Sequence, residues 1–83
     1  MPGSPARLTI YSRSGCHLCD DMLDRLSTFQ PEFGFHLTVI DIVGDARLEA
    51  RFGRRVPLLV AGEREICHYF LDEQALRDYL AGV

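Results

Sequence analysis

Apolar positions in the N-terminal part of the chain predict a strand followed by a helix. Residues 7–11 form a short run rich in β-forming side chains. From Cys16 to about Phe29, apolar side chains recur every three or four positions, as on the buried face of a helix. Pro31 and Gly34 mark the break that we expect after this helix.

Apolar positions in the rest of the chain predict a strand, a short helix, a hairpin and a last helix. Residues 35–42 are apolar on both faces, as a strand covered by helices on both sides would be. Aspartates and glycines bound the later elements, since they favour helix caps and tight turns. These elements are a helix over 44–53 capped by Asp45, strands over 56–62 and 64–70, and a helix that follows Asp72.

The order of these elements predicts an α/β fold with the topology β-α-β-(α)-β-β-α. The first two strands should lie parallel, because a right-handed helical crossover connects them. The last two should lie antiparallel, because only a tight turn separates them. The result is a four-stranded mixed sheet with helices on both faces. We expect residues 1–6 to be a disordered N-terminal tail and residues 7–83 to form a single domain.

Composition excludes several classes of function. The 83 residues are 47% hydrophobic and 25% charged, which is typical of a soluble globular domain. The net charge is −3, and the nine basic residues are all arginines without a basic block, so a nucleic-acid partner is not expected. No segment has the roughly 20 apolar residues of a membrane span, and the opening "MPGSPAR" does not resemble a secretory signal. We therefore expect a cytoplasmic protein, in which structural disulfides are rare.

Cys16 and Cys19 form a C-x-x-C motif where the first strand gives way to the first helix. Free N–H groups and the helix dipole stabilise a thiolate at that position. Cys19 lies one turn further on and can close a disulfide with Cys16. The motif thus predicts a redox dithiol in which Cys16 attacks a substrate disulfide and Cys19 resolves the mixed disulfide.

Other interpretations of the cysteine pair stay open. His17 and Cys67 could complete a zinc site on paper, although their spacing does not suggest one. An iron–sulfur cluster could be shared between two chains that each supply Cys16. The pair could also be packed and inert. The sequence favours redox chemistry over all three, and it predicts no bound metal.

Two further residues each allow two interpretations. Cys67 lies in a predicted strand and is better explained as a small buried hydrophobe than as a site of glutathionylation or of a regulatory disulfide. Asp41 lies near the end of the second strand. A buried Asp41 with a raised pKa could shuttle a proton. Contact with solvent or with a helix cap is the simpler interpretation, and we favour it.

Two segments resemble the glutaredoxins, a family with the thioredoxin fold. "YSRSGCHLC" over 11–19 is similar to the family's strand and active-site segment, with Arg13 where the family usually has lysine. "RRVPLLV" over 54–60 resembles its Val-Pro segment. The similarity runs from residue 7 to about residue 80. Within the family, the chain more narrowly resembles small bacterial glutaredoxin-like proteins of largely undefined role. The chain departs from the family in having His-Leu between its cysteines and no glycine pair in "CHYFLDEQ" over 67–74.

The resemblance implies a thiol–disulfide oxidoreductase that reduces protein or glutathione mixed disulfides. It implies a cis Val56–Pro57 bond, glutathione as co-substrate and no bound cofactor. The partners would be disulfide-containing proteins or glutathione and a possible reductase, with a monomeric chain. The implied substrate-binding or glutathione-binding residues are Arg13, His17, Arg54, Val56, Pro57 and Asp72. Two alternative functions are a glutathione-dependent iron–sulfur carrier and a redox-inactive interaction domain.

Overall fold

A single mixed sheet organises the computed structural model, which describes residues 6–82. Its strands lie in the order β2-β1-β3-β4. The elements are β1 (Arg7–Ser12), α1 (His17–Phe33), β2 (His36–Asp41), α2 (Ala46–Phe52), β3 (Leu58–Ala61), β4 (Arg64–His68) and α3 (Glu73–Ala81). β1 pairs parallel with β2 and antiparallel with β3, and β3 pairs antiparallel with β4. The predicted α/β fold class and element order are confirmed.

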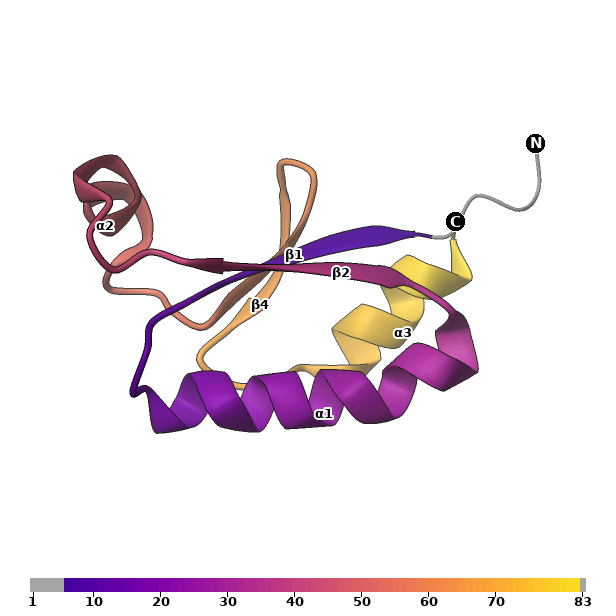
Figure 1. The fold of residues 1–83 in the computed structure, drawn as a ribbon. Helices are drawn as coiled ribbons and strands as arrows, with labels where there is room; N and C mark the ends of the chain where they lie inside the picture. The colour runs from indigo at the N-terminus through magenta and orange to yellow at the C-terminus, as the bar shows by residue number, and fades with distance from the viewer. Residues whose placement is uncertain (1–5, 83) are drawn as a thin grey trace.

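Helices flank both sides of the sheet. Figure 1 shows α1 and α3 together below the sheet and α2 above it, near the end where β1 leads into α1. The hydrophobic core lies between the sheet and the α1–α3 layer. Its buried members are Leu8, Ile10, Met22, Leu26, Phe29, Phe35, Leu59, Ala61, Cys67, Leu76 and Leu80. Because Cys67 is only 8% exposed, the interpretation of this residue as a packed hydrophobe is confirmed.

Side chains cap the N-termini of α1, α2 and α3. Asp45 accepts the Leu48 N–H at 3.0 Å at the start of α2, and Asp72 accepts the Ala75 N–H at 3.0 Å at the start of α3. Each bond satisfies a backbone donor that the first helical turn leaves free. Both predicted aspartate caps are confirmed. Cys16 caps α1, and this cap is described with the site below.

The predicted break at Pro31 is wrong. α1 continues through Pro31 to Phe33 and ends at Gly34, which adopts φ 71°, a left-handed conformation suited to glycine. A proline costs the helix one backbone hydrogen bond. The last turn is nevertheless packed, since the rings of Phe29 and Phe33 lie 6.1 Å apart and the Arg77 guanidinium of α3 lies over both.

The prediction that the second strand is covered on both faces is also wrong. β2 is an edge strand, and its Val39 is 51% exposed. The residues that flank it, Phe35 and Ile42, are buried instead. Full burial belongs to β3, whose four residues are all buried and which lies between β1 and β4. An apolar run identifies a strand, but it does not give that strand's place in the sheet.

Residues 1–5 of the predicted N-terminal tail lie outside the described residues. Ala6 is described, and its carbonyl accepts the His36 N–H at 2.7 Å, which extends the backbone pairing by one residue beyond β1. The boundary at residue 7 and the single-domain assignment stay predictions.

Candidate functional site

The sulfur of Cys16 occupies the N-cap of α1. Cys16 has an extended backbone (φ −96°, ψ 116°), and its Sγ accepts the Cys19 N–H at 3.1 Å. Its carbonyl also accepts the Asp20 N–H at 3.1 Å. In other helices a serine or aspartate oxygen fills this position. A partly exposed sulfur is therefore aimed at the positive end of a 17-residue helix.

Cys19 lies one helical turn further on and is 1% exposed. Its pKa is raised to about 11, first by burial and then by a side-chain hydrogen bond with Cys16. A backbone hydrogen bond with Arg13 opposes the rise without cancelling it. At neutral pH Cys19 is therefore a protonated thiol that donates toward the Cys16 sulfur. The two cysteines differ sharply in exposure, with Cys16 as the accessible member of the pair.

A four-residue turn leads from β1 into the dithiol. The Cys16 N–H donates to the Arg13 carbonyl at 3.2 Å, and Gly15 within the turn has φ 79°. A positive φ at this turn position favours glycine, because a β-carbon would be strained there. The sequence therefore places a glycine where the chain must reverse just before the Cys16 sulfur.

Arg13 connects this turn to α2. Its guanidinium donates to both carboxylate oxygens of Glu49, at 2.7 and 2.8 Å, and to the Gly53 carbonyl at 3.2 Å. These hydrogen bonds lower the pKa of Glu49 below its usual value. Glutathione binding by Arg13 stays a prediction. The Arg13 guanidinium already donates hydrogen bonds to Glu49. Sequence reasoning missed Glu49, which lies 36 residues away.

Ser14 and Asp41 connect the same turn to the end of β2. The Ser14 hydroxyl donates to one Asp41 carboxylate oxygen, and the Val43 N–H donates to the other at 2.9 Å. These hydrogen bonds lower the pKa of Asp41, which is exposed. A buried proton shuttle with a raised pKa is therefore the wrong interpretation. The favoured contact with solvent is confirmed, whereas the cap of the following helix is Asp45 and not Asp41. Sequence reasoning missed Ser14, although β1 and β2 are parallel and their carboxyl ends meet.

The Val56–Pro57 peptide bond is cis, as the resemblance implied. Val56 is half-buried and Pro57 is fully buried. The Pro57 carbonyl accepts the Tyr69 N–H at 2.8 Å, and the Tyr69 hydroxyl donates to the Arg54 carbonyl. The segment after β4 therefore holds the Val-Pro segment in place. Direct contact between Pro57 and Cys16 stays a prediction.

The remaining predicted residues lie on the surface. His17 is the exposed first residue of α1, Arg54 is exposed, and Asp72 is exposed at the N-cap of α3. Their roles toward a substrate stay predictions. Within residues 6–82, no three His, Cys, Asp or Glu side chains are placed to share a metal ion, so His17 and Cys67 do not complete a zinc site with the pair. No helix in this range is long and apolar enough to cross a membrane.

Comparison with known proteins places the chain among relatives of similar length. It is 30% identical to the uncharacterized protein Rv0508 of Mycobacterium tuberculosis, over 94% of this chain and 86% of that protein. The solution NMR structure of protein Ne2328 from Nitrosomonas europaea is 40% identical, with a TM-score of 0.82 over 95% of both chains. Thioredoxin 1 of Thermosipho africanus is 20% identical with a TM-score of 0.61, covering 90% of this chain and 94% of that one, which shows a shared fold.

A family model fixes the assignment. The model of the Glutaredoxin-like domain (DUF836) matches residues 7–81, which include the whole sheet and all three helices. The fold that the chain shares with thioredoxin agrees with this assignment. The chain belongs to the glutaredoxin-like family.

Proposed function

We propose that this chain is a thiol–disulfide oxidoreductase of glutaredoxin type, with Cys16 as nucleophile and Cys19 as resolving thiol. The supporting observation is the N-cap sulfur, which accepts the Cys19 N–H at the positive end of α1. A hydrogen bond to the charged form of a group favours that form, and the helix dipole acts in the same direction. The thiolate is the attacking species in disulfide exchange.

The reaction proceeds through two exchanges at the Cys16 sulfur. In the first, the Cys16 thiolate attacks one sulfur of the substrate disulfide, so that a Cys16–substrate S–S bond forms as the substrate's own S–S bond breaks. The departing thiolate takes up a proton. In the second, Cys19 loses its proton to water and attacks the Cys16 sulfur. The Cys16–Cys19 disulfide forms, and the substrate cysteine leaves as a thiolate that is then protonated.

Electrons balance over these exchanges, since the dithiol loses two and the substrate disulfide gains two. A thiol reductant returns two electrons to the Cys16–Cys19 disulfide before the next cycle. In this proposal, the reductant is either two glutathione molecules or the dithiol of a reductase. No bound cofactor is needed, and one chain is sufficient for both exchanges.

Glutathione would approach from the side of the Val-Pro segment. The backbone of Val56, next to a buried Pro57, is the proposed partner for an extended peptide. Arg54 is the better candidate for a glutathione carboxylate than Arg13, because the Arg13 guanidinium is occupied by Glu49 whereas Arg54 is exposed.

Redox titration of the three cysteines tests the proposal. The purified protein is equilibrated in glutathione buffers of graded potential, its thiols are trapped, and each cysteine is assigned by mass spectrometry. We expect Cys16 and Cys19 to interconvert as a pair, with a Cys16–glutathione adduct on the way. If the Cys16–Cys19 disulfide forms without a glutathione adduct, glutathione is not a substrate. If the two cysteines never form a disulfide, the proposed function is refuted.

Two variants sharpen the titration. Cys19→Ser should accumulate the Cys16 mixed disulfide, because the resolving thiol is gone. Cys67→Ala is the matched control, since Cys67 is a buried core residue whose pKa is raised by burial. This control should titrate like the wild-type chain. Equal accumulation of the adduct in both variants would contradict the assignment of Cys19.

A further inference from the structure

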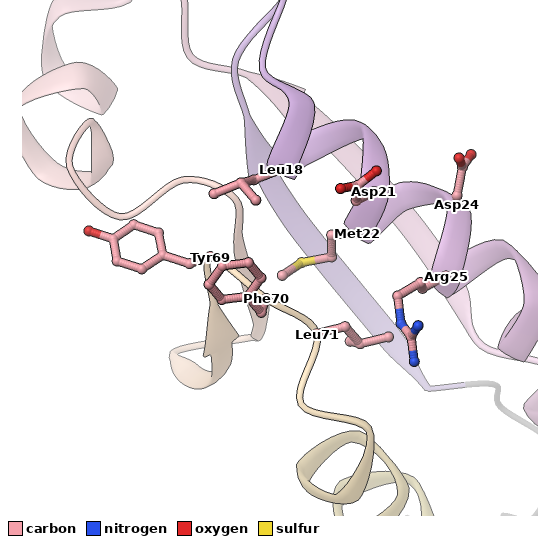
Figure 2. A pocket seen from close by; sticks show the side chains of 8 residues that line it. All are labelled: Leu18, Asp21, Met22, Asp24, Arg25, Tyr69, Phe70 and Leu71. Atoms are coloured by element: carbon pink, nitrogen blue, oxygen red, sulfur yellow. The ribbon is translucent and has the colours of Figure 1, made fainter.

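A groove of about 490 Å³ begins at the C-x-x-C motif. It lies between α1 and the segment that connects β4 to α3 (Figure 2). Leu18, which stands between the two cysteines, is part of its wall. The α1 side is formed by Leu18, Asp21, Met22, Asp24 and Arg25, and the opposite side by Tyr69, Phe70 and Leu71.

The centre of this groove is apolar and open. Figure 2 shows Leu18 and Met22 of α1 facing Phe70 across it. Phe70 is 69% exposed and Tyr69 is 40% exposed, whereas Met22 is almost fully buried beneath them. A large exposed aromatic side chain loses its contact with water when a partner covers it. The groove therefore offers a place for an apolar side chain.

The α1 rim of the groove is acidic. Among residues 6–82, Asp21 and Asp24 are exposed and neither forms an ion pair. Arg25, the basic residue of the same rim, is paired with Glu73 of α3. Two carboxylates are therefore left uncompensated. They complement a positive charge on whatever lies in the groove.

We propose that this groove binds the polypeptide that flanks the substrate cysteine and selects an apolar side chain together with a lysine or arginine. The inference rests on the proposed function, because the groove acts during the first exchange at Cys16. A volume of this size suits a few side chains of an extended segment. The substrate class is thus a disulfide of a basic, apolar protein segment.

Geometry along α1 fixes the spacing of the basic residue. Asp21 and Asp24 follow Cys16 by five and eight positions, which on a helix is a rise of about 7.5 and 12 Å. An extended chain advances about 3.3 Å per residue. The lysine or arginine should therefore lie roughly two to four positions from the substrate cysteine.

Activated peptides test the groove directly. Each peptide carries one cysteine as a mixed disulfide with an aromatic nitrothiobenzoate, which is the better leaving group, so that Cys16 attacks the peptide sulfur and a coloured thiolate leaves. One peptide has a phenylalanine and a lysine in the expected positions, and its partner has glutamate in place of lysine. The rate of colour release by the reduced wild-type protein is compared at low and high salt.

We expect the lysine peptide to react about five times faster or more at low salt, and the two rates to converge in about 1 M salt. Asp21→Asn/Asp24→Asn should reduce the preference to within about twofold. Asp20→Asn is the matched control, because Asp20 lies on the same helix but outside the groove. It should keep the preference. Phe70→Ala should slow both peptides without changing their ratio.

The possible outcomes distinguish a failure of the proposed substrate binding in the groove from a failure of the proposed thiol–disulfide exchange. Equal rates for both peptides would overturn the proposal that the groove selects a basic residue. A preference for the lysine peptide that survives the double substitution would overturn it as well. If colour is released but no Cys16–Cys19 disulfide follows, the proposed function fails whichever peptide is preferred. A preference lost equally in Asp20→Asn would assign the effect to general charge near the thiol and would also overturn the groove.

Discussion

Arg13 donates hydrogen bonds to both carboxylate oxygens of Glu49, at 2.7 and 2.8 Å, although the two residues lie 36 positions apart in the sequence. The pair ties the turn before Cys16 to α2, while Ser14 ties the same turn to Asp41 at the end of β2. A two-point contact between arginine and carboxylate fixes orientation as well as distance. The loop that presents the Cys16 sulfur is therefore held from two sides by elements that follow it in the chain.

Glu49 should make the fold sensitive to acid. Its pKa is lower in the folded chain than the ordinary value of 4.5, because Arg13 donates hydrogen bonds to its carboxylate. The unfolded chain then binds the proton more readily, so the contribution to stability is present above about pH 4.5 and is lost as the pH falls. Urea unfolding between about pH 6 and pH 3 should show a smaller loss in Glu49→Gln than in the wild-type chain.

A charge-matched control separates this effect from general titration. Glu63 is exposed and, within residues 6–82, forms no ion pair. Glu63→Gln should follow the wild-type acid profile. If the two variants behave alike, the Arg13–Glu49 contact does not contribute to the pH dependence.

The two cysteines of the motif should differ in reactivity. Cys16 is partly exposed, whereas Cys19 is 1% exposed with a pKa of about 11. Alkylation at about neutral pH, followed by mass spectrometry of the peptides, should modify Cys16 first. Cys67 serves as an internal comparison, since burial raises its pKa as well. Modification of Cys19 before Cys16 would contradict the structure.

Alkaline pH should weaken the fold through Cys19. Its folded pKa of about 11 exceeds the ordinary value of 9.0, so the unfolded chain releases this proton first as the pH rises. The free energy of unfolding should therefore fall between pH 9 and pH 11. Cys19→Ala should lose less stability over this interval, as measured by urea unfolding. A variant with the wild-type slope would assign the loss to other groups, including Cys67.

Leu26 should be a more costly position of α1 to truncate than Leu23. It is fully buried in the core between α1 and the sheet. Leu26→Ala should cost about 2–5 kcal/mol of unfolding free energy, because it removes buried methyl groups and leaves a cavity. Leu23 lies on the same helix but is only half-buried. Leu23→Ala should therefore cost less in the same urea titration, and an equal cost would contradict the assigned core face.

Local signals in the sequence predicted the local structure. The caps Asp45 and Asp72 were predictable because a capping side chain bonds to a backbone group three residues away. Cys16 at the start of α1 followed from the change of hydrophobic period after β1. The cis Val56–Pro57 bond came from the family resemblance alone.

Long-range relationships were not predictable from the pattern. The Arg13–Glu49 contact depends on where α2 packs, which no local periodicity specifies. The exposure of Val39 depends on the place of β2 at the sheet edge. α1 continues through Pro31, and the aromatic rings around that turn pack against Arg77 of another helix. In each case the feature involves a tertiary contact that local propensity leaves open.

Because a sulfur caps α1, the proposed oxidation of Cys16 should be detectable in the first turn of this helix. A serine or aspartate cap cannot form a disulfide, whereas the Cys16 sulfur would change its bonding in the proposed cycle. The Cys19 N–H donates to this sulfur at 3.1 Å, so the protection of the Cys19 amide should change when Cys16 forms a disulfide. Amide hydrogen exchange at this single position should thus follow the redox cycle, without any label on the chain.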